Sequence, residues 1–496
     1  MSEMALTRSA SAAASSATPA VHRLRLPTMI AYGIGQVAEA LKTVGFNVFL
    51  LFYYQQIVGL SGTLTSAALA ISLIIDAFCD PLAGALSDRF RSRWGRRHPF
   101  LVVAAIPLAL TFYLLFNPPA GFGDLGHFVW LLVFAILARI ALTFVQVPHL
   151  ALGAEIAHDY GQRSSLFAFN VLFGTLGGAV GSALAYRLFF PTTQAFNPGL
   201  LNAAGYQQFS LTFSVGMVLA IAVCALGTAR EIPHLPVLAK LHQRFSLPQL
   251  LREVQAAFRN PSFRTLFLGM MLATLMLSIE AVFNPFMGVH FWGLTTEQLS
   301  VLPLVAVFGL VGSLLLIPPV TRWLDKKMTL ISMSLIAIVN GNILICVKLV
   351  LPQLLPANGS SGLLVLIAIA TFIGTLMGPL IFATLNSMFA DIVDEHELET
   401  GERREGIIFA ARSFAIKATS SIGLIIGGVV LDWIGFPQHA PAGSVAADVL
   451  WYMGLITGPL ASLFVTIGVL MYMGYRLDRA RHAEILQQLQ ARRAAT

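Results

Sequence analysis

Charged residues are scarce in this sequence. They make up 11% of the chain and hydrophobic residues 56%, whereas soluble domains carry about 25% charged residues. Apolar runs of about 20 residues, long enough to cross a bilayer, recur along the whole length. These runs are too long for the strands of an outer-membrane barrel, which alternate over about 10 residues. We therefore expect an all-α polytopic membrane protein surrounded by the lipid bilayer.

Several signatures of other protein classes are missing. The three cysteines lie inside apolar segments, which argues against a disulfide framework. GTLGGAVG lies in an apolar segment and lacks the Lys-Ser/Thr ending of a nucleotide-binding loop, so we expect no bound nucleotide. His149 has no companion at ligand spacing, so we expect no metal beyond a coupling Na⁺ and no cofactor. Residues 1–26 lack the apolar core of a secretory signal and are interpreted as a disordered cytoplasmic tail.

The basic residues follow a membrane pattern. The net charge is +7, and the loop SDRFRSRWGRRHP alone has five arginines. Segment 229–262, the loop TRWLDKK and the C-terminal residues are also basic, whereas the intervening loops have almost no Lys or Arg. Basic residues concentrate in cytoplasmic loops, so both termini are expected in the cytoplasm of a plasma-membrane protein. The charge therefore does not indicate nucleic-acid binding.

The apolar segments divide the chain into two halves. We expect twelve spans, at 28–57, 62–86, 99–117, 128–155, 165–190, 208–228, 263–291, 298–320, 328–350, 362–389, 406–434 and 449–475. The expected parts are a tail (1–26), a six-helix bundle (27–228), a cytoplasmic linker with an amphipathic helix (229–262), a second six-helix bundle (263–477) and a cytoplasmic tail (478–496). The loops after spans two and eight, which take equivalent places in the two halves, both carry an aspartate and several basic residues, as expected for a duplicated transporter.

Two aspartates lie near the middle of span two. Asp76 and Asp80 are four residues apart, which places both on one helical face. Two such carboxylates cannot both stay ionised at low dielectric without a cation between them or a shared proton. The pair therefore predicts a site for a coupling ion, H⁺ or Na⁺; the alternative is a structural ion pair with a basic residue on another helix.

Other polar residues within the spans are candidates for substrate contacts. Lys417 in span eleven is a candidate counter-charge for the aspartates. Arg139 in span four and Arg412 in span eleven could bind an anionic or hydroxyl-rich solute. The alternative for these two arginines is an ion pair with Asp76, Asp80 or Glu280. Glu39 and Lys42 form either a local ion pair or a substrate contact. Glu280 and Asn284 line the cavity or join two helices. The glycines of span five, Gly174, Gly177, Gly178 and Gly181, predict close helix packing.

Three motifs resemble one transporter family. DAFCDP, SDRFRSRWGRRHPF and MFADIVDEHEL followed by RREG and Lys417 are similar to the glycoside–pentoside–hexuronide:cation symporters, the melibiose permease family. The resemblance extends from about Tyr32 through span eleven. It implies the major facilitator fold, with two six-helix bundles and alternating access.

The resemblance also assigns roles. It implies a cation site at Asp76, Asp80, Cys79 and Thr143, with Lys417 at the family's span-eleven lysine. Cys79 replaces an asparagine whose amide oxygen would bind sodium, which favours proton coupling. The family's sugar-binding aspartates and tryptophan are replaced by Ala40, Gln146 and Leu150, so galactoside specificity does not carry over. Gln146 and Arg139 remain as hydrogen-bonding groups.

The expected function is cation-coupled symport of a small polar solute, a sugar or glycoside, by a monomer that is not an enzyme. The expected gate is a set of cytoplasmic salt bridges that holds the outward-facing state, between Asp88, Arg89, Arg93, Arg96, Arg97 and Asp391, Asp394, Glu395, Glu405. A lysolipid carrier remains the alternative within transport. A membrane enzyme or sensor is the alternative of another class, but no nucleophile–base pair is apparent.

Overall fold

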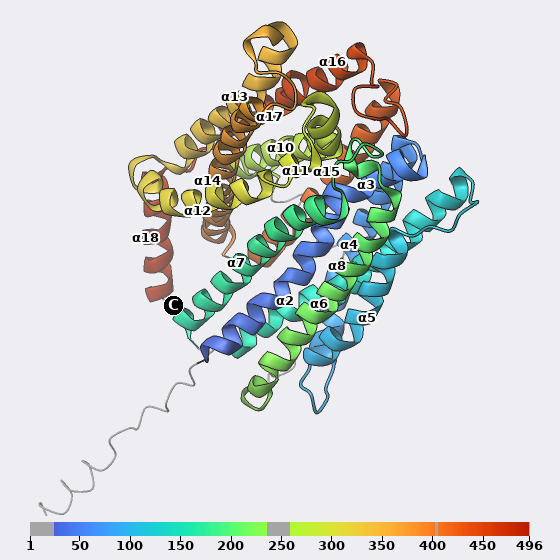
Figure 1. The fold of residues 1–496 in the computed structure, drawn as a ribbon. Coiled ribbons are helices and arrows are strands. Elements are labelled where there is room, and N and C mark those ends of the chain that lie inside the picture. The colour runs from blue at the N-terminus through green and yellow to red at the C-terminus, as the bar shows by residue number, and fades with distance from the viewer. Residues whose placement is uncertain (1–23, 158, 236–257, 402–404, 496) are drawn as a thin grey trace, which may run out of the picture.

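The computed structural model describes residues 24–157, 159–235, 258–401 and 405–495, and every regular element in these ranges is helical. Twelve helical segments of the described chain are long and apolar enough to cross a membrane. Figure 1 shows them as two bundles, the first coloured blue to green and the second yellow to red. The expected all-α membrane fold is confirmed. The predicted linker helix and residues 1–23 of the predicted tail lie outside the described residues.

The first bundle is built around its first and fourth spans. Its helices are α2 (Leu26–Val44) continued to Val58 by two π-helical segments with α3 (Leu51–Tyr53) between them, α4 (Gly62–Arg89), α5 (His98–Leu115), α6 (Asp124–Ile156), α7 (Tyr160–Leu184) continued to Phe189, and α8 (Ala203–Thr228). α2 packs between α7 and α8, and α6 packs against α4 and α5. Gly174, Gly177 and Gly181 of α7 lie against Gln36, Val37 and Leu41, so the predicted glycine packing face is confirmed against α2.

The second bundle repeats this arrangement. Its helices are α10 (Pro261–Phe286) continued to Phe291, α11 (Thr296–Leu299), α12 (Leu302–Trp323), α13 (Lys326–Val350), α14 (Ser361–Thr400), α15 (Glu405–Trp433), and α16 (Ala447–Leu455) continued through a π-helical segment (Ile456–Leu460) into α17 (Ala461–Tyr472). α10 packs between α15 and α17, and α14 packs against α12 and α13. These pairings match those of the first bundle, as expected for a duplicated fold.

Two helix boundaries differ from the sequence-based prediction. The predicted span 298–320 is split, because a capping box at Thr295 and Gln298 starts the separate short helix α11. The predicted span 362–389 continues to Thr400. Ile392 and Val393 lie beyond the predicted span, yet their side chains are still buried in the core of the second bundle. Gly401 then ends α14 with a positive φ of 78° that favours glycine.

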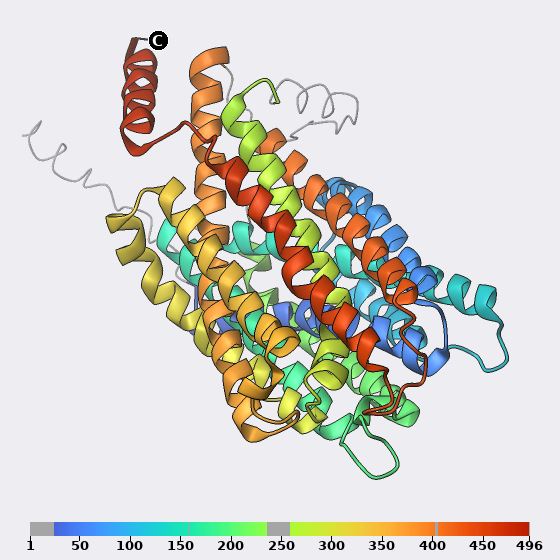
Figure 2. The ribbon, with the colours of Figure 1, turned by 90° about the horizontal axis from the view of Figure 1, so that it is seen from above.

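The C-terminal segment contains a further helix. Residues predicted as a tail form helix α18 (Arg479–Ala495), which packs against α14. Figure 2 shows α18 beside the projecting end of α14. Ile485 and Leu489 are buried in the core of the second bundle. Their spacing of four residues places them on one helical face, a signal present in the sequence.

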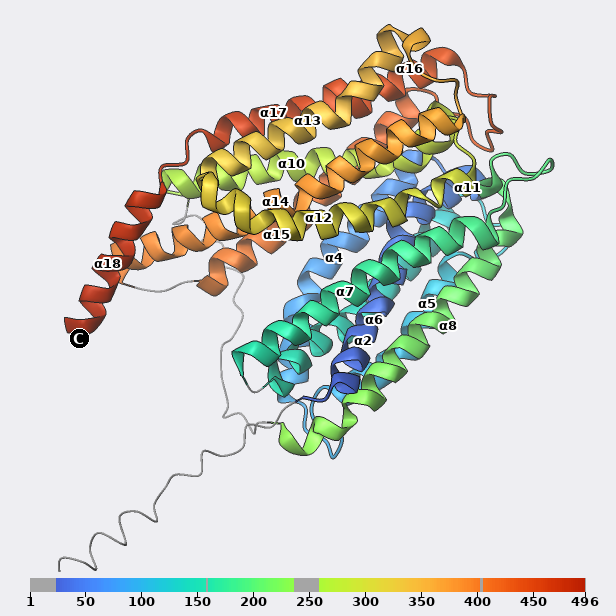
Figure 3. The same ribbon diagram turned by 60° about the vertical axis from the view of Figure 1, so that its left-hand side comes forward.

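The two bundles meet along equivalent helices. α4 packs against α15, and α7 packs against α12. Figure 3 shows the bundles converging near α11 and diverging toward the end that carries α18. We call this second end the basic end, because the loop with Arg96 and Arg97 lies there; the other is the opposite end.

Hydrogen bonds join the bundles at the opposite end. The Asp432 carboxylate accepts from the backbone N–H groups of Gly62 and Thr63, both at 2.8 Å. It thereby caps the first turn of α4 from the other half of the molecule. Thr192 donates its backbone N–H to Glu297 at 2.7 Å, and its hydroxyl lies 2.8 Å from that of Thr296. The bundles are thus closed to each other at this end.

Candidate functional site

The paired aspartates form an ion cluster between the bundles. Lys417 Nζ on α15 lies 2.9 Å from Asp76 Oδ2 and 2.6 Å from Asp80 Oδ2 on α4. The Thr143 hydroxyl on α6 lies 2.9 Å from Asp76 Oδ1 and 3.3 Å from Asp80 Oδ1. One ammonium group therefore bridges two carboxylates that one turn of helix places side by side. Three elements from both halves meet at this point.

The two carboxylates differ in access. The Asp80 side chain is 41% exposed, whereas that of Asp76 is 14% exposed and that of Lys417 is 21% exposed. An ion that approaches the cluster therefore reaches Asp80 first. A bound cation would take the place of the Lys417 ammonium, because both need the same oxygen atoms. The arrangement is chemically suited to exchange of one positive charge for another.

Cys79 lies beside this cluster, where it interacts electrostatically with Asp76, Asp80 and Lys417, but it does not bond to them. Its thiol is partly exposed and has no hydrogen bond within the described residues. The structure thus brings together three of the four residues implied by the resemblance, namely Asp76, Asp80 and Thr143, and adds Lys417.

A chain of polar side chains runs beside the ion cluster. Gln146 on α6 donates to Gln36 on α2 at 3.1 Å, and Gln36 donates to Glu39 at 3.2 Å. The Thr43 hydroxyl donates to the other Glu39 oxygen at 2.8 Å. Sequence reasoning missed Gln36 and Thr43, although both lie on the face of α2 that carries Glu39. These hydrogen-bonded side chains place amide and carboxylate groups beside the ion cluster, where the hydroxyl groups of a solute could bind.

Lys42 and Arg139 lie against one aromatic ring. Lys42 Nζ is 4.7 Å and Arg139 Cζ is 4.9 Å from the ring centre of Phe46. Arg139 Nε donates to the Ser72 hydroxyl at 3.0 Å. The local ion pair that the sequence allowed between Glu39 and Lys42 is not formed, because Glu39 bonds Gln36 and Thr43 instead. Arg139 likewise makes no ion pair with an acidic side chain in the described chain.

Three other candidate residues lie apart from this cluster. Arg412 is buried between α10 and α14, where its guanidinium bonds Asn386 and lies 5.1 Å from the ring of Phe382. Glu280 on α10 is partly buried and Asn284 is exposed. Neither makes a side-chain hydrogen bond to another described residue. The structure therefore does not place these three residues in the Asp76 cluster.

The arginines of the first basic loop bind within their own half. Arg97 donates from Nε to Glu155 at 2.8 Å and contacts Ser87 and Asp88 through its other nitrogens. Arg96 Nη2 lies 3.0 Å from Glu155. Arg93 lies over Trp94, and Arg89 makes no side-chain hydrogen bond to another described residue. Sequence reasoning missed Glu155, an acidic residue at the basic end of span four.

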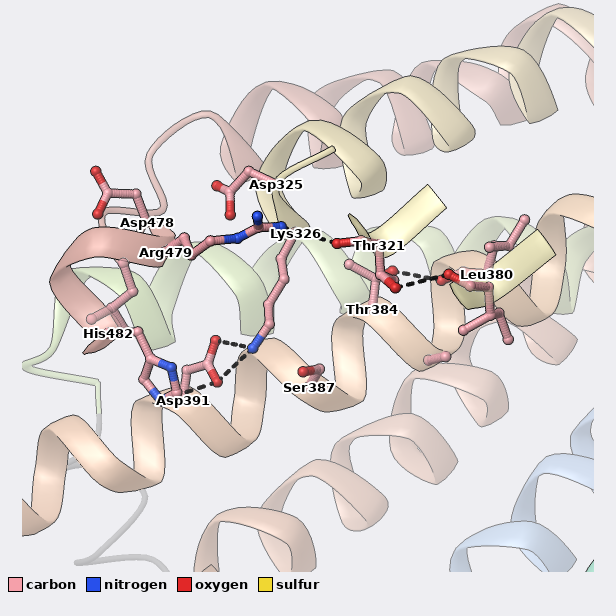
Figure 4. Close-up of a pocket in the computed structure, with 13 residues that line it drawn as sticks. Thr321, Asp325, Lys326, Leu380, Thr384, Ser387, Asp391, Asp478, Arg479 and His482 are labelled. Carbon is pink, nitrogen blue, oxygen red and sulfur yellow. Dashed lines mark hydrogen bonds and ion pairs between the residues drawn. The ribbon is translucent and has the colours of Figure 1, made fainter. Parts of the chain in front are cut away.

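The second half has a matching charge cluster, shown in Figure 4. Lys326 at the start of α13 lies 2.7 Å from Asp391 on α14, just as Arg97 at the start of α5 meets Glu155 on α6. His482 of α18 lies 3.4 Å from Asp391 and 3.2 Å from Asp394. A cavity of about 350 Å³ adjoins these residues.

Tyr475 completes this second cluster. Burial and the negative charge of Asp391 raise the pKa of Tyr475, so its phenol stays protonated and donates to Asp391 at 3.4 Å. The ion pairs found between described residues at the basic end each lie within one bundle. The gate that we expect to hold the outward-facing state stays a prediction. The side chain of Glu405 lies outside the described residues.

The fold and site define a membrane transporter of the major facilitator type. Solved structures with this fold include the nucleoside transporter NupG, with a TM-score of 0.59 and 16% identity over 90% of this chain and 99% of that chain. The inward-open xylose transporter XylE of Escherichia coli has a TM-score of 0.55 and 14% identity over 93% of this chain and 98% of that one. At this identity the likeness concerns the fold alone.

Sequence comparison gives the family. A profile described as "MFS/sugar transport protein" matches residues 31–479, so the chain belongs to this family of transporters and is not an enzyme. The uncharacterized symporter sll1374 of Synechocystis is 27% identical over 95% of this chain and 97% of its own length. The putative glycoside/cation symporter YagG of Escherichia coli is 26% identical over 95% and 96%. The isoprimeverose transporter of Lactiplantibacillus pentosus is 24% identical over 92% and 91%.

Proposed function

We propose that the protein is a cation-coupled symporter that carries a sugar or glycoside by alternating access. The observation that carries this proposal is the contact of Lys417, on the second half, with Asp76 and Asp80 on the first. The relatives named as a glycoside/cation symporter and an isoprimeverose transporter support a saccharide as the cargo. They do not favour the lysolipid cargo that the sequence left open.

We infer a location in the cytoplasmic membrane with the basic end inside. The arginines and lysines at this end support that orientation, because basic loops stay on the cytoplasmic side. The relative named as an inner membrane symporter supports the same membrane. With this orientation, the hydrogen bonds of Asp432 and Thr192 close the outer side, and the conformation is inward-facing. We expect a monomer to suffice, since both halves of the site lie on one chain.

The coupling step follows from charge. In the empty carrier Lys417 compensates one of the two negative charges of the aspartate pair, which makes the conformational change of the unloaded protein less costly. A cation from outside replaces the ammonium group at Asp76 and Asp80, and the solute then binds beside it. We infer that only the fully loaded or the empty carrier changes conformation readily.

We favour the proton as the coupling ion. Sodium needs several hard oxygen ligands, and the residue before Asp80 is Cys79, whose thiol is a soft ligand. A carboxylate pair needs no further ligand to take up a proton.

The test is made in proteoliposomes with a panel of sugars and glycosides, with lysolipids as controls. A cargo sugar is expected to drive proton uptake in the wild type and none in Asp76→Asn, which removes one carboxylate but keeps the shape. Asp448→Asn serves as a matched control, because it removes a carboxylate outside the ion cluster. Accumulation against a gradient by Asp76→Asn would disprove the coupling assignment, and a response to lysolipids alone would disprove the saccharide.

A further inference from the structure

A second set of hydrogen bonds joins the bundles at the opposite end. The Gln56 side chain donates to the Pro437 carbonyl at 2.8 Å and accepts from the backbone N–H of Ala440 at 2.8 Å. The neighbouring Gln55 donates to the Phe436 carbonyl at 3.5 Å. Both glutamines follow α3 in the first bundle, and their three partners lie in the loop that follows α15 in the second. We call the segment from Phe436 to Ala440 the clasped loop, because the two glutamines hold it against the first bundle.

His290 packs against the clasped loop without a polar partner. It is 6% exposed, and neither of its ring nitrogens has a hydrogen-bond partner among the described residues. Its ring meets that of Phe436 edge to face, with the ring centres 5.3 Å apart. Phe436 packs in turn on Phe286, and Phe286 on Phe52 of the first bundle, with 5.0 and 5.1 Å between ring centres. The ring that covers one edge of His290 is thus part of the contact between the bundles.

The described charged groups near His290 do not bond to its ring. The titratable and charged side chains on α10 and on the elements around its π-helical end are Glu280, Glu297, Lys348, Asp432, His439 and Asp448. Four of them bond other groups, namely Glu297, Lys348, Asp432 and Asp448. A buried charge without a partner costs several kcal/mol. The imidazole of His290 is therefore expected to be uncharged while the clasped loop covers it.

We propose that His290 is a proton sensor in the closure at the opposite end. A proton from the water on that side binds a ring nitrogen when the clasped loop moves away and the imidazole becomes hydrated. Because the charged form is costly in the covered position, protons bind the open form better and shift the population toward it. Imidazoles change charge between about pH 5 and pH 8, so acid conditions favour opening and alkaline conditions favour closure.

This sensor goes beyond the proposed symport. With the orientation proposed above, acid outside opens the carrier to the side from which it loads. The proton on His290 is distinct from the coupling ion, which binds at Asp76 and Asp80. The response is therefore expected whether the coupling ion is H⁺ or Na⁺.

The distance between spin labels at the opposite end tests this proposal. Labels are placed on two exposed loop residues, Ala120→Cys in the first bundle and Gln353→Cys in the second, in the full-length protein with Cys79, Cys224 and Cys346 replaced by serine or alanine. Distances are measured in nanodiscs without solute at about pH 8 and about pH 5.5. The ratio of open to closed protein should rise by about tenfold or more, since one bound proton changes it by up to about tenfold per pH unit. An unchanged ratio would overturn the proposal.

Variants separate His290 from the ion cluster. His290→Asn is expected to abolish the pH response, because an amide side chain stays uncharged. His127→Asn is the matched control and should keep the response, since His127 lies near the start of α6 in the first bundle, outside the clasped loop. Asp76→Asn should keep it as well, because this change affects the ion cluster alone. A response that persists in His290→Asn would contradict the proposal, and its loss in Asp76→Asn would then assign the proton to the ion cluster.

A second variant tests the same proposal without changing the imidazole. Thermal unfolding midpoints show whether His290→Asn folds. Phe436→Ala removes the ring that covers His290 and keeps the backbone carbonyl that Gln55 contacts. Water then reaches the imidazole in the closed form too, so the pH response should shrink severalfold. A full response in this variant would exclude the clasped loop as the cover of His290. These distances are measured without cargo, so a negative result leaves the symport proposal intact.

Discussion

Lys417 is the residue through which the second half of the protein reaches the ion site of the first. It contacts both Asp76 and Asp80, although more than 300 positions separate them from it in the chain. In the proposed mechanism, this single ammonium group is the counter-charge when no cation is bound. The empty carrier depends on it more than the loaded carrier does.

This role predicts a specific transport defect for Lys417→Gln. Without the ammonium group, the empty carrier has two uncompensated carboxylates and should return slowly, while the cation-loaded carrier still crosses. We expect the ratio of sugar exchange to net uptake to rise by about tenfold or more, because an unpaired buried charge costs several kcal/mol. Counterflow and net uptake in the same proteoliposomes measure the ratio. An unchanged ratio would mean that Lys417 is not the counter-charge.

The choice of coupling ion is a second prediction at this scale. Uptake by the wild type should follow an imposed pH gradient and remain the same when Na⁺ is replaced by K⁺. The physical reason is the donor set, in which Asp76, Asp80 and Thr143 are the described oxygen ligands. Uptake that requires Na⁺ at constant pH would show that further ligands complete a sodium site.

At the scale of elements, α4 carries both the ion site and one side of the outer closure. Its N-terminus is capped by Asp432 from the second half, and Ser61 caps it from its own chain. Asp76 and Asp80 lie further along the same helix. A change in the contact of α4 with α15 therefore acts on the outer closure and on the ion cluster together.

Asp432→Ala is predicted to weaken the outer closure. The loss of a capping carboxylate costs about 0.5–2 kcal/mol, so the inward-facing population should fall by up to about thirtyfold relative to the outward-facing one. Spin labels on the outer ends of the two halves would report this change as a longer distance. Asp448→Ala is the matched control, since the Asp448 carboxylate bonds only its neighbour Val449 in the described chain. An unchanged distance distribution would exclude Asp432 as a determinant of closure.

At the scale of the whole molecule, the two bundles have similar helix packing, and hydrogen bonds join them at the opposite end. The pairs Arg97–Glu155 and Lys326–Asp391 occupy equivalent places at the basic end. In both cases the ion pair lies within one bundle, so the basic end is free of described ion pairs between bundles. Alternating access requires the closure to move from the opposite end to the basic end.

A disulfide across the outer closure should therefore stop transport. The hydroxyl oxygens of Thr192 and Thr296 lie 2.8 Å apart on different bundles, within reach of a disulfide. In a background with Cys79, Cys224 and Cys346 replaced by serine or alanine, oxidation of Thr192→Cys with Thr296→Cys should abolish uptake, and reduction should restore it. Each single cysteine variant is the control. Full transport by the cross-linked protein would contradict alternating access between the bundles.

Much of this protein was predictable from its sequence. The twelve apolar segments follow from the length of helix that a bilayer demands, and Asp76 and Asp80 share a face because of the helical repeat. The glycines of span five predicted the approach of α7 to α2, because small residues allow close contact. These features depend on neighbours a few residues apart and on the solvent around each helix.

The tertiary structure alone decided the partners of the charged groups. Nothing near Lys42 in the sequence shows that Glu39 bonds Gln36 and Thr43 rather than Lys42. The contacts of Lys417 with the aspartates, of Arg97 with Glu155 and of Asp432 with the start of α4 all join distant segments. Local sequence sets the helical face that a side chain occupies, but only the packing of the helices sets which side chains meet across it.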